Sequence, residues 1–397
     1  MQKFKLLITE AAADESKLTH LEHAEDHPIN AGAAGFEHAK KTLLGVHKAM
    51  QGGKSGVSLS TKYDGSPSIV AGYHPENGKF FIMTKSGFNK TPKINYTPED
   101  IERNHGHAPG LVSKLKAALQ HLPKIMPKEG IYQGDIMHSG GKSKSNPEGD
   151  VKTEGGQASF TPNTITYTTK REGEAEQASK SKLGVAFHTA YHGPSLKKMK
   201  AKYNAGMEGF TEHPDVHLID VGYNANKSKY SPADAEAFQQ HMDNAEHFHD
   251  ELKKSGGYEA VARHVDHIKT YINQTVRTGE DPSVEGYTQH VAGIYKKAAD
   301  KLKTEAGKSK NINAGKELTD HAENNSQHLE NAFQMHKELQ QAKNVMVKSL
   351  SSHQEYAHTI NGKSVKPEGF VAVINNRPTK MNDRHEFNRL NFEKNAR

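Results

Sequence analysis

The chain has 397 residues, of which 34% are hydrophobic and 25% charged, with a formal net charge of +6 and no cysteine. This length predicts two or three domains, and the lack of cysteine excludes disulfides and thiolate metal sites. No apolar run approaches the roughly 18 residues of a membrane-spanning helix, whereas the mild positive charge is typical of proteins with an anionic partner such as nucleic acid.

The first residues contain a short pattern that could be a leader. Leu7-Ile8-Thr9-Glu10 is followed by three alanines. This arrangement resembles the capsid-targeting leaders of tailed phages, which the prohead protease cuts after an aliphatic-x-Glu triplet. The resemblance implies packaging in a phage head, with the prohead protease and the capsid as partners. An ordinary frayed terminus is the alternative interpretation.

The remaining elements fall into a strand-rich region and a helical block. Apolar residues at helical intervals predict a helix over about 15–50, which Gly52 and Gly53 end. Strands are expected at 57–63, 67–73, 79–84, 130–137, 158–169, 183–191 and 216–221, with a helix at 100–122 and a mobile loop at 138–157. From about 231 to 350 the chain is polar and helix-forming, and strand character resumes at 369–375.

Because a strand returns after so long a helical block, we expect the block to be inserted into the strand-rich domain. The predicted fold class is α+β. The predicted segments are an N-terminal leader with helices (1–50), the first part of the strand-rich core (51–228), a helical insertion (229–355) and the final core strands (356–397).

A lysine, an aspartate and a glycine at the end of the first expected strand form the first chemical motif. In Lys62-Tyr63-Asp64-Gly65 an amine at a rigid strand end stands beside a flexible glycine, so it can approach a phosphate closely. Lysine titrates near ~10.4, so a nucleophilic lysine needs nearby cations or a metal to lose its proton. Alone, this tetrapeptide is common in surface turns.

Later segments, in order along the chain, make the motif more specific. The chain resembles the covalent nucleotidyltransferase superfamily of DNA ligases, RNA ligases and mRNA-capping enzymes, in which the lysine of the first motif forms a phosphoramidate with the nucleotide. Segment 83–87 resembles the Ser-Arg-x-Gly element of that family, with Lys85 in place of arginine. Segment 130–136 resembles the third motif, with Asp135 as its acidic residue.

Three further segments extend the resemblance. Segment 185–191 resembles the strand whose aromatic residue stacks on the base, and Phe187 is the candidate. Segment 367–371 resembles the fourth motif, with Glu368 as the metal-binding glutamate, and 379–382 resembles the fifth, with Lys380 on the α-phosphate.

The resemblance implies a core of antiparallel sheets with flanking helices and an ATP-dependent polynucleotide ligase activity. Lys62 would attack ATP, and Asp64 and Gly65 would complete the nucleotide site. Lys85 and Lys380 would offset phosphate charge. Asp135 and Glu368 would hold Mg²⁺, or Mn²⁺ in its place. The implied partners are nucleic acid strand ends, and the expected location is the host cytoplasm.

Several departures from the family pattern leave alternatives open. Ser60 and Thr61 occupy the positions where family members carry an adenine-reading glutamate, and Ser66 follows the glycine where an arginine is usual. Val373 replaces a lysine that DNA ligases carry after the fourth motif, and the internal helices favour an RNA-type enzyme. The alternatives are a non-catalytic phage virion or nucleic-acid-binding protein on a decayed core, and an enzyme that transfers a nucleotide to another acceptor, such as a protein side chain.

Overall fold

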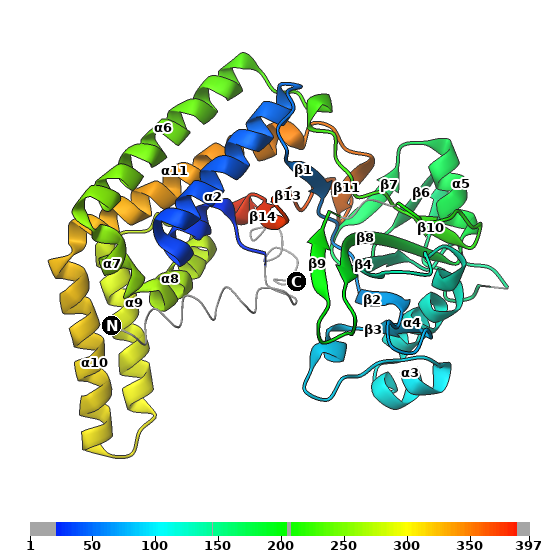
Figure 1. Ribbon diagram of the computed structural model, residues 1–397, viewed down its shortest axis with the longest axis horizontal. Helices are drawn as coiled ribbons and strands as arrows, with labels where there is room; N and C mark the ends of the chain where they lie inside the picture. The colour runs from blue at the N-terminus through cyan, green and yellow to red at the C-terminus, as the bar shows by residue number, and fades with distance from the viewer. Residues whose placement is uncertain (1–20, 145, 205–207, 387–397) are drawn as a thin grey trace. The chain divides into compact units, whose positions relative to one another are not determined.

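The computed structural model describes residues 21–144, 146–204 and 208–386, which form two compact units (Figure 1). The core unit contains Ser58–Asn224 and His353–Pro378, and the helical unit contains Glu22–Val57, Ala225–Ser352 and the residues from Thr379 on. Helices and mixed sheets together confirm the α+β class. The leader pattern at 7–13 lies outside the described residues.

The division into units differs from the predicted one at both ends of the chain. The helix predicted near the N-terminus belongs to the helical unit and is not a separate segment. The last core strand crosses into the helical unit after Pro378, so the predicted final segment, 356–397, is divided between the two units. Both differences arise because these segments pair with elements that hydrophobic periodicity does not identify.

The central sheet of the core unit has six strands. Its order is β10-β8-β4-β2-β3, with β9 on β8, and only the β10–β8 pair is parallel. The strands are β2 (Ser68–Tyr73), β3 (Phe80–Met83), β4 (Ile131–His138), β8 (Leu183–His192), β9 (Lys200–Tyr203) and β10 (Val216–Leu218).

Two helices cover one face of this sheet. The single helix predicted over 100–122 is divided into α3 (Pro98–His105) and α4 (Pro109–His121), because Gly106 ends the first and Pro109 starts the second. Ile101 and Leu115 from these helices pack on Ile69 of β2 in the main core cluster. The opposite face of β4 and β8 therefore remains for other contacts.

A second, fully antiparallel sheet has the order β12-β11-β7-β6-β5. The strand predicted at 158–169 is two strands, because a turn at Pro162 and Asn163 interrupts it, and the predicted mobile loop at 138–157 contains a strand of its own. The strands are β5 (Lys152–Glu154), β6 (Gln157–Phe160), β7 (Thr166–Thr169), β11 (Tyr356–Ile360) and β12 (Lys363–Ser364), and α5 (Glu172–Lys180) follows β7.

The third sheet joins the two ends of the core unit. Strand β1 (Ser58–Thr61) pairs antiparallel with β13 (Phe370–Ile374), with Thr61 opposite Phe370, and β14 (Arg377–Met381) follows β13 in the sheet. Residues before the helical insertion thus form a sheet with residues after it.

The helical unit is built on long helices, of which α6 and α11 pack along each other (Figure 1). Helix α6 begins with a Ser231–Asp234 capping box and ends at Gly256, whose positive φ suits glycine. The buried Lys343 ammonium donates to Glu25 at 2.6 Å. The helices are α2 (His27–Met50), α6 (Pro232–Ser255), α7 (Gly257–Ala262), α8 (Val265–Thr278), α9 (Val284–Asp300), α10 (Glu305–Asn324) and α11 (Ser326–Leu350). Among the described residues, no helix has the length and apolar character needed to cross a membrane.

Candidate active site

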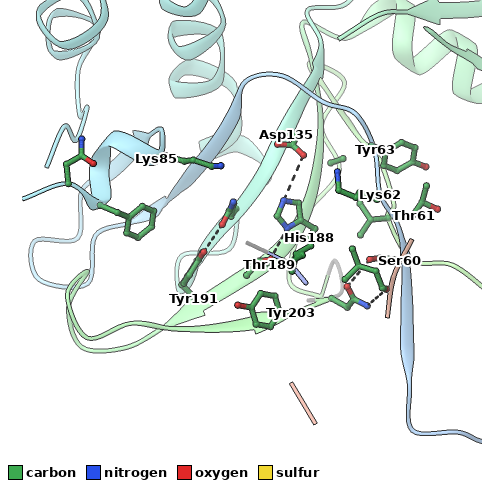
Figure 2. A pocket seen from close by; sticks show the side chains of 18 residues that line it. Ser60, Thr61, Lys62, Tyr63, Lys85, Asp135, His188, Thr189, Tyr191 and Tyr203 are labelled. Atoms are coloured by element: carbon green, nitrogen blue, oxygen red, sulfur yellow. Dashed lines mark hydrogen bonds and ion pairs between the residues drawn. The ribbon is translucent and has the colours of Figure 1, made fainter. Parts of the chain in front are cut away.

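A cavity of about 410 Å³ lies within the core unit, against the face of β4 and β8 that α3 and α4 leave uncovered (Figure 2). Side chains from β1, β4, β8 and β9 line it, together with the turn of 3₁₀ helix η2 (Lys85–Phe88). The volume lies within the ~300–1,000 Å³ typical of small-molecule sites.

Lys62 enters this cavity because the adjoining residues are fixed on both sides. Its backbone N–H donates to the Gly369 carbonyl at 2.9 Å, which continues the β1–β13 pairing by one residue. The next side chain, Tyr63, is buried against the rings of Tyr167 and Tyr356. The Lys62 side chain lines the cavity, and Tyr63 borders the cavity from this aromatic cluster.

The Lys62 ammonium forms an ion pair with the carboxylate of Glu368. The lysine side chain is 27% exposed and the glutamate side chain 7%. Glu368 stands two residues before β13, and the β1–β13 register therefore brings together two residues that are 306 positions apart. The pair connects the predicted nucleophile to the predicted metal ligand.

Asp135 is the acidic residue inside the cavity. It lies on β4 opposite Ser68 of β2, and Figure 2 shows Lys62 and Lys85 on either side of it. Burial raises the pKa of the Asp135 carboxyl to about 6, although the charges of Lys62 and Lys85 and a hydrogen bond from Ser68 act in the opposite direction. A bound cation would favour the ionised carboxylate.

Gly65 is required because the chain passes very close to β4. A methyl group on Gly65 would lie 2.3 Å from the Asp135 Cβ and 2.8 Å from the Met137 sulfur. Any larger residue would displace the strand that carries Asp135. Gly65, which was predicted to lie close to the nucleotide, thus leaves the space that Asp135 needs at the cavity.

Asp64 stabilises a turn next to the site, and it is not among the residues that line the cavity. Its carboxylate accepts from the Asn163 amide and from the Thr164 backbone N–H, each at 2.8 Å. Its own N–H donates to the Tyr167 hydroxyl oxygen at 2.6 Å. These contacts hold the turn between β6 and β7 against the chain that follows Lys62, which is a bracing role and not the predicted nucleotide contact.

Lys85 lines the cavity from the start of η2, as its place in the motif predicted. The Thr84 side chain accepts from the Ser86 N–H and so caps this turn. Gly87 allows the turn to fold back on β3, since a methyl group there would lie 2.0 Å from the Met83 sulfur. Thr84 and Gly87 therefore both position Lys85.

Phe187 does not reach the cavity, so its predicted role in base stacking is wrong for this structure. Its side chain is 3% exposed and belongs to the main core cluster, with its ring 6.1 Å from that of Tyr132. The neighbouring Ala186 and His188 line the cavity instead. Side chains on a strand alternate between faces, and the predicted aromatic falls on the face covered by helices.

Lys380 belongs to the helical unit, in the part of β14 beyond Pro378. Its backbone N–H donates to the Glu22 carbonyl at 2.8 Å within that unit. It is not among the residues that line the cavity. Its predicted contact with an α-phosphate stays a prediction.

His188 is the most prominent cavity residue that the motif comparison missed. Its Nε2 lies 4.0 Å from an Asp135 carboxylate oxygen, and its Nδ1 lies 2.8 Å from the Thr189 hydroxyl. Burial, with a further effect of the Lys62 charge, lowers the pKa of His188 to about 4. The imidazole is therefore neutral near pH 7 and can act as a hydrogen-bonding group.

Two further polar pairs complete the walls. The Tyr191 hydroxyl donates to the side-chain amide oxygen of Gln133 at 2.6 Å, and the Ser60 hydroxyl donates to that of Asn204 at 2.8 Å. All four residues line the cavity. Ser60 holds the position of the missing adenine-reading glutamate, so Asn204 adds an amide beside that position.

The model of one protein family, described as "Family of unknown function (DUF6267)", matches residues 18–396. The chain belongs to this family. No curated protein matches the chain, and no solved structure matches it either.

In this DUF6267 member the carboxylates of Asp135 and Glu368 are the candidate ligands for a hard cation. Within 21–144, 146–204 and 208–386 no group of three or more His, Asp or Glu side chains is arranged to hold a metal ion. Two carboxylates suit Mg²⁺, which keeps several waters and is commonly completed by substrate phosphates. The cavity therefore contains an amine, one carboxylate and a second lysine, and Glu368 is connected to it through its ion pair with Lys62.

Proposed function

We propose that the protein is an ATP-dependent polynucleotide ligase that acts through a lysyl-AMP intermediate on Lys62. The observation that carries this proposal is the placement of the Lys62 amine in a cavity beside Glu368, Asp135 and Lys85. Asp135 and Lys85 line the same cavity as the amine, and Glu368 is paired with the amine itself. The order of the motifs along the chain supports the same assignment.

In the first step the Lys62 nitrogen attacks the α-phosphorus of ATP. The nitrogen–phosphorus bond forms, the bond from the α-phosphorus to the bridging oxygen breaks, and pyrophosphate leaves. The ammonium loses one proton before the attack and a second as the new bond forms. Glu368, already paired with the ammonium, is the nearest candidate to receive the first proton.

The charges around the cavity serve the transferring phosphate. Lys85 would offset the negative charge that develops on the phosphate oxygens. Asp135 and Glu368 would hold Mg²⁺, or Mn²⁺, which supplies further charge neutralisation when bound. Glu368 can act as a ligand only after it leaves the Lys62 ammonium, so cation binding and release of the amine would be linked.

Two further transfers would complete strand joining. A 5′-phosphate oxygen attacks the phosphorus of lysyl-AMP, so that a phosphoanhydride forms and the amine is regenerated. A 3′-hydroxyl then attacks the 5′-phosphate, a phosphodiester bond forms, and AMP leaves. The partners would be nucleic acid strand ends, RNA or DNA.

Labelling with α-³²P-ATP and Mg²⁺ tests the proposal. Wild type should keep an acid-labile, base-stable label after denaturation, and neither Lys62→Ala nor Lys62→Arg should be labelled. Lys62→Arg is the sharper control, because it keeps a cation beside Glu368 and removes the nucleophile. Absence of label from any of the four nucleotides would instead favour the non-catalytic nucleic-acid-binding alternative. Labelled wild type offered nicked DNA and nicked RNA then separates a ligase from a protein-modifying enzyme.

The compartment forms a separate part of the proposal. We infer a site of action in the host cytoplasm, with packaging in a phage head if the pattern at 7–10 is a leader. Mass spectrometry of the native N-terminus tests the leader: a chain that starts at Ala11 supports cleavage by a prohead protease, and a start at Met1 or Gln2 contradicts it.

A further inference from the structure

Two segments of the core unit carry lysine as their only charged residue. Segments 79–98 and 193–204 contain eight lysines and no aspartate, glutamate, arginine or histidine. All eight are exposed, and none forms an ion pair within the described residues. We call them the lysine rim: Lys79, Lys85, Lys90, Lys93, Lys197, Lys198, Lys200 and Lys202.

The lysine rim accounts for more than the whole net charge of the protein. The chain has a formal net charge of +6, and these two segments contribute +8, so the remaining residues carry −2. The positive charge is therefore concentrated in two short stretches and is not spread over the surface. Such concentration is the electrostatic pattern expected for a polyanionic partner.

The fold brings the two segments together. Met83 from the first segment and Met199 from the second are buried in one hydrophobic cluster. Phe88 and Ile94 of the first segment and Leu196 of the second also pack on this cluster. Both segments are thus anchored by a shared core.

A second cavity, of about 600 Å³, opens between these segments. Met83, Lys90 and Ile94 line it from the first segment, and Leu196 and Lys197 from the second. His74 and Glu76, which precede the first segment, line it as well. It shares Phe88 and Asn89 with the cavity that contains Lys62, which we call the nucleotide cavity, so the two cavities adjoin. Phe88 is half-buried and lines both.

We propose that the lysine rim and the second cavity hold a single-stranded polynucleotide and lead its end to the nucleotide cavity. Single-strand sites combine a positively charged groove with aromatic side chains on which bases stack. The rim supplies the charge, and Phe88 supplies an aromatic face at the junction of the two cavities. The role given to the bound strand, as a substrate for joining, rests on the proposed ligase function.

Strand binding can be measured apart from that function. A 5′-fluorescein-labelled 20-nucleotide single strand, DNA or RNA, is titrated with protein without ATP, and anisotropy is recorded from 50 to 300 mM KCl. The test variant is Lys197→Ala/Lys198→Ala/Lys200→Ala/Lys202→Ala. The matched control is Lys296→Ala/Lys297→Ala/Lys301→Ala/Lys303→Ala, which removes four exposed lysines from the helical unit.

The rim variant should bind at least about tenfold more weakly at 50 mM KCl, and its log–log salt slope should be smaller by up to about 3, since each lost phosphate contact changes a single-strand slope by about 0.7. The control should bind like wild type. Phe88→Leu should weaken binding with the salt slope unchanged, because stacking releases no counterions.

Three results would overturn this inference. They are wild-type affinity in the rim variant, an equal loss in the rim and control variants, and equally tight binding of duplex DNA. Labelling of Lys62 by ATP needs no nucleic acid strand, so it tests the ligase function separately. If the rim variant is labelled normally and also binds the strand normally, the strand-binding role of the rim is refuted and the ligase function is not. If wild type is not labelled but strand binding still depends on the rim, the ligase function is refuted and the role of the rim is not.

Discussion

The ammonium of Lys62 is paired with the carboxylate of Glu368, although 306 positions separate the two residues. The pair lies at the junction of β1 and β13, with a side-chain exposure of 7% for the glutamate. It fixes the amine in position. If the proposed function is right, a nucleotide and a cation compete with Glu368 for the amine.

The first prediction concerns the energy of this pair. Lys62→Ala should destabilise the protein by about 1–3 kcal/mol, because the Glu368 carboxylate loses its ammonium partner while it stays buried. Lys62→Arg should change stability by less than about 1 kcal/mol. Urea unfolding followed by circular dichroism measures both. The double variant Lys62→Ala/Glu368→Gln should recover part of the loss, and a double variant less stable than Lys62→Ala would contradict the pairing.

The second prediction tests the close approach of Gly65 to β4. Gly65→Ala should cost about 1–3 kcal/mol from overpacking and lower the rate of Lys62 labelling about 100-fold, because Asp135 moves relative to the amine. Gly293→Ala is the matched control, since Gly293 is inside α9 with open space around it. The control should gain up to about 1 kcal/mol. Normal labelling by Gly65→Ala would show that the position of Asp135 does not matter.

The third prediction separates the two faces of β8. Phe187→Leu should cost about 1 kcal/mol through core packing and leave the labelling rate of the folded protein unchanged. His188→Asn should lower ATP-dependent labelling about tenfold, the equivalent of one hydrogen bond to the ligand, with a smaller effect on stability. Labelling rates and unfolding midpoints of the two variants give the comparison. A loss of labelling in Phe187→Leu alone would reverse the assignment of faces.

The fourth prediction is a dependence of stability on pH. Burial, with a contribution from His321, lowers the pKa of His264 to about 4 from an ordinary value of 6.5. Between these pH values the unfolded chain binds more protons than the folded one, so stability falls as the pH is lowered from 6.5 to 4 and is retained above 6.5. Burial also lowers the pKa of His358 to about 4, which acts in the same direction.

Unfolding midpoints at pH 7.5, 6 and 5 measure this dependence. The His264 contribution should be on the order of 3 kcal/mol at pH 4, and His264→Gln should reduce the slope. His264 contacts the Tyr287 hydroxyl and His321, each at 2.8 Å, so the glutamine should also cost about 1 kcal/mol at pH 7.5. A variant with the wild-type slope would contradict the effect of burial.

The order of short motifs was the most reliable signal in the sequence. Lys62, Lys85 and Asp135 were singled out as separate segments, and the fold brings them to one cavity. Glu368 joins them through its pair with Lys62. Motif order works here because each segment ends or lies on a strand whose register fixes the direction of one side chain.

The prediction for Phe187 failed, and His188 was missed, at the level of strand faces. Strand β8 is buried along almost its whole length, so apolar residues occupy both of its faces and alternation gives no direction. A register shift between Gln133 and Gly134 on the paired strand adds to the ambiguity. Only the packing of α3 and α4 decides which face is the core, and that packing cannot be read from β8 itself.

The pairing of β1 with β13 also determines when the site can exist during synthesis. Lys62 is made early, but the strand that pairs with its segment is made some 300 residues later. Until then the segment of Lys62 lacks its pairing strand, although most of the helical unit, Ala225–Ser352, has already been made. Such late closure is slow, since distant segments must meet before the contact stabilises either. If Lys62 accepts a nucleotide, as we propose, charging can begin only after β13 has been made.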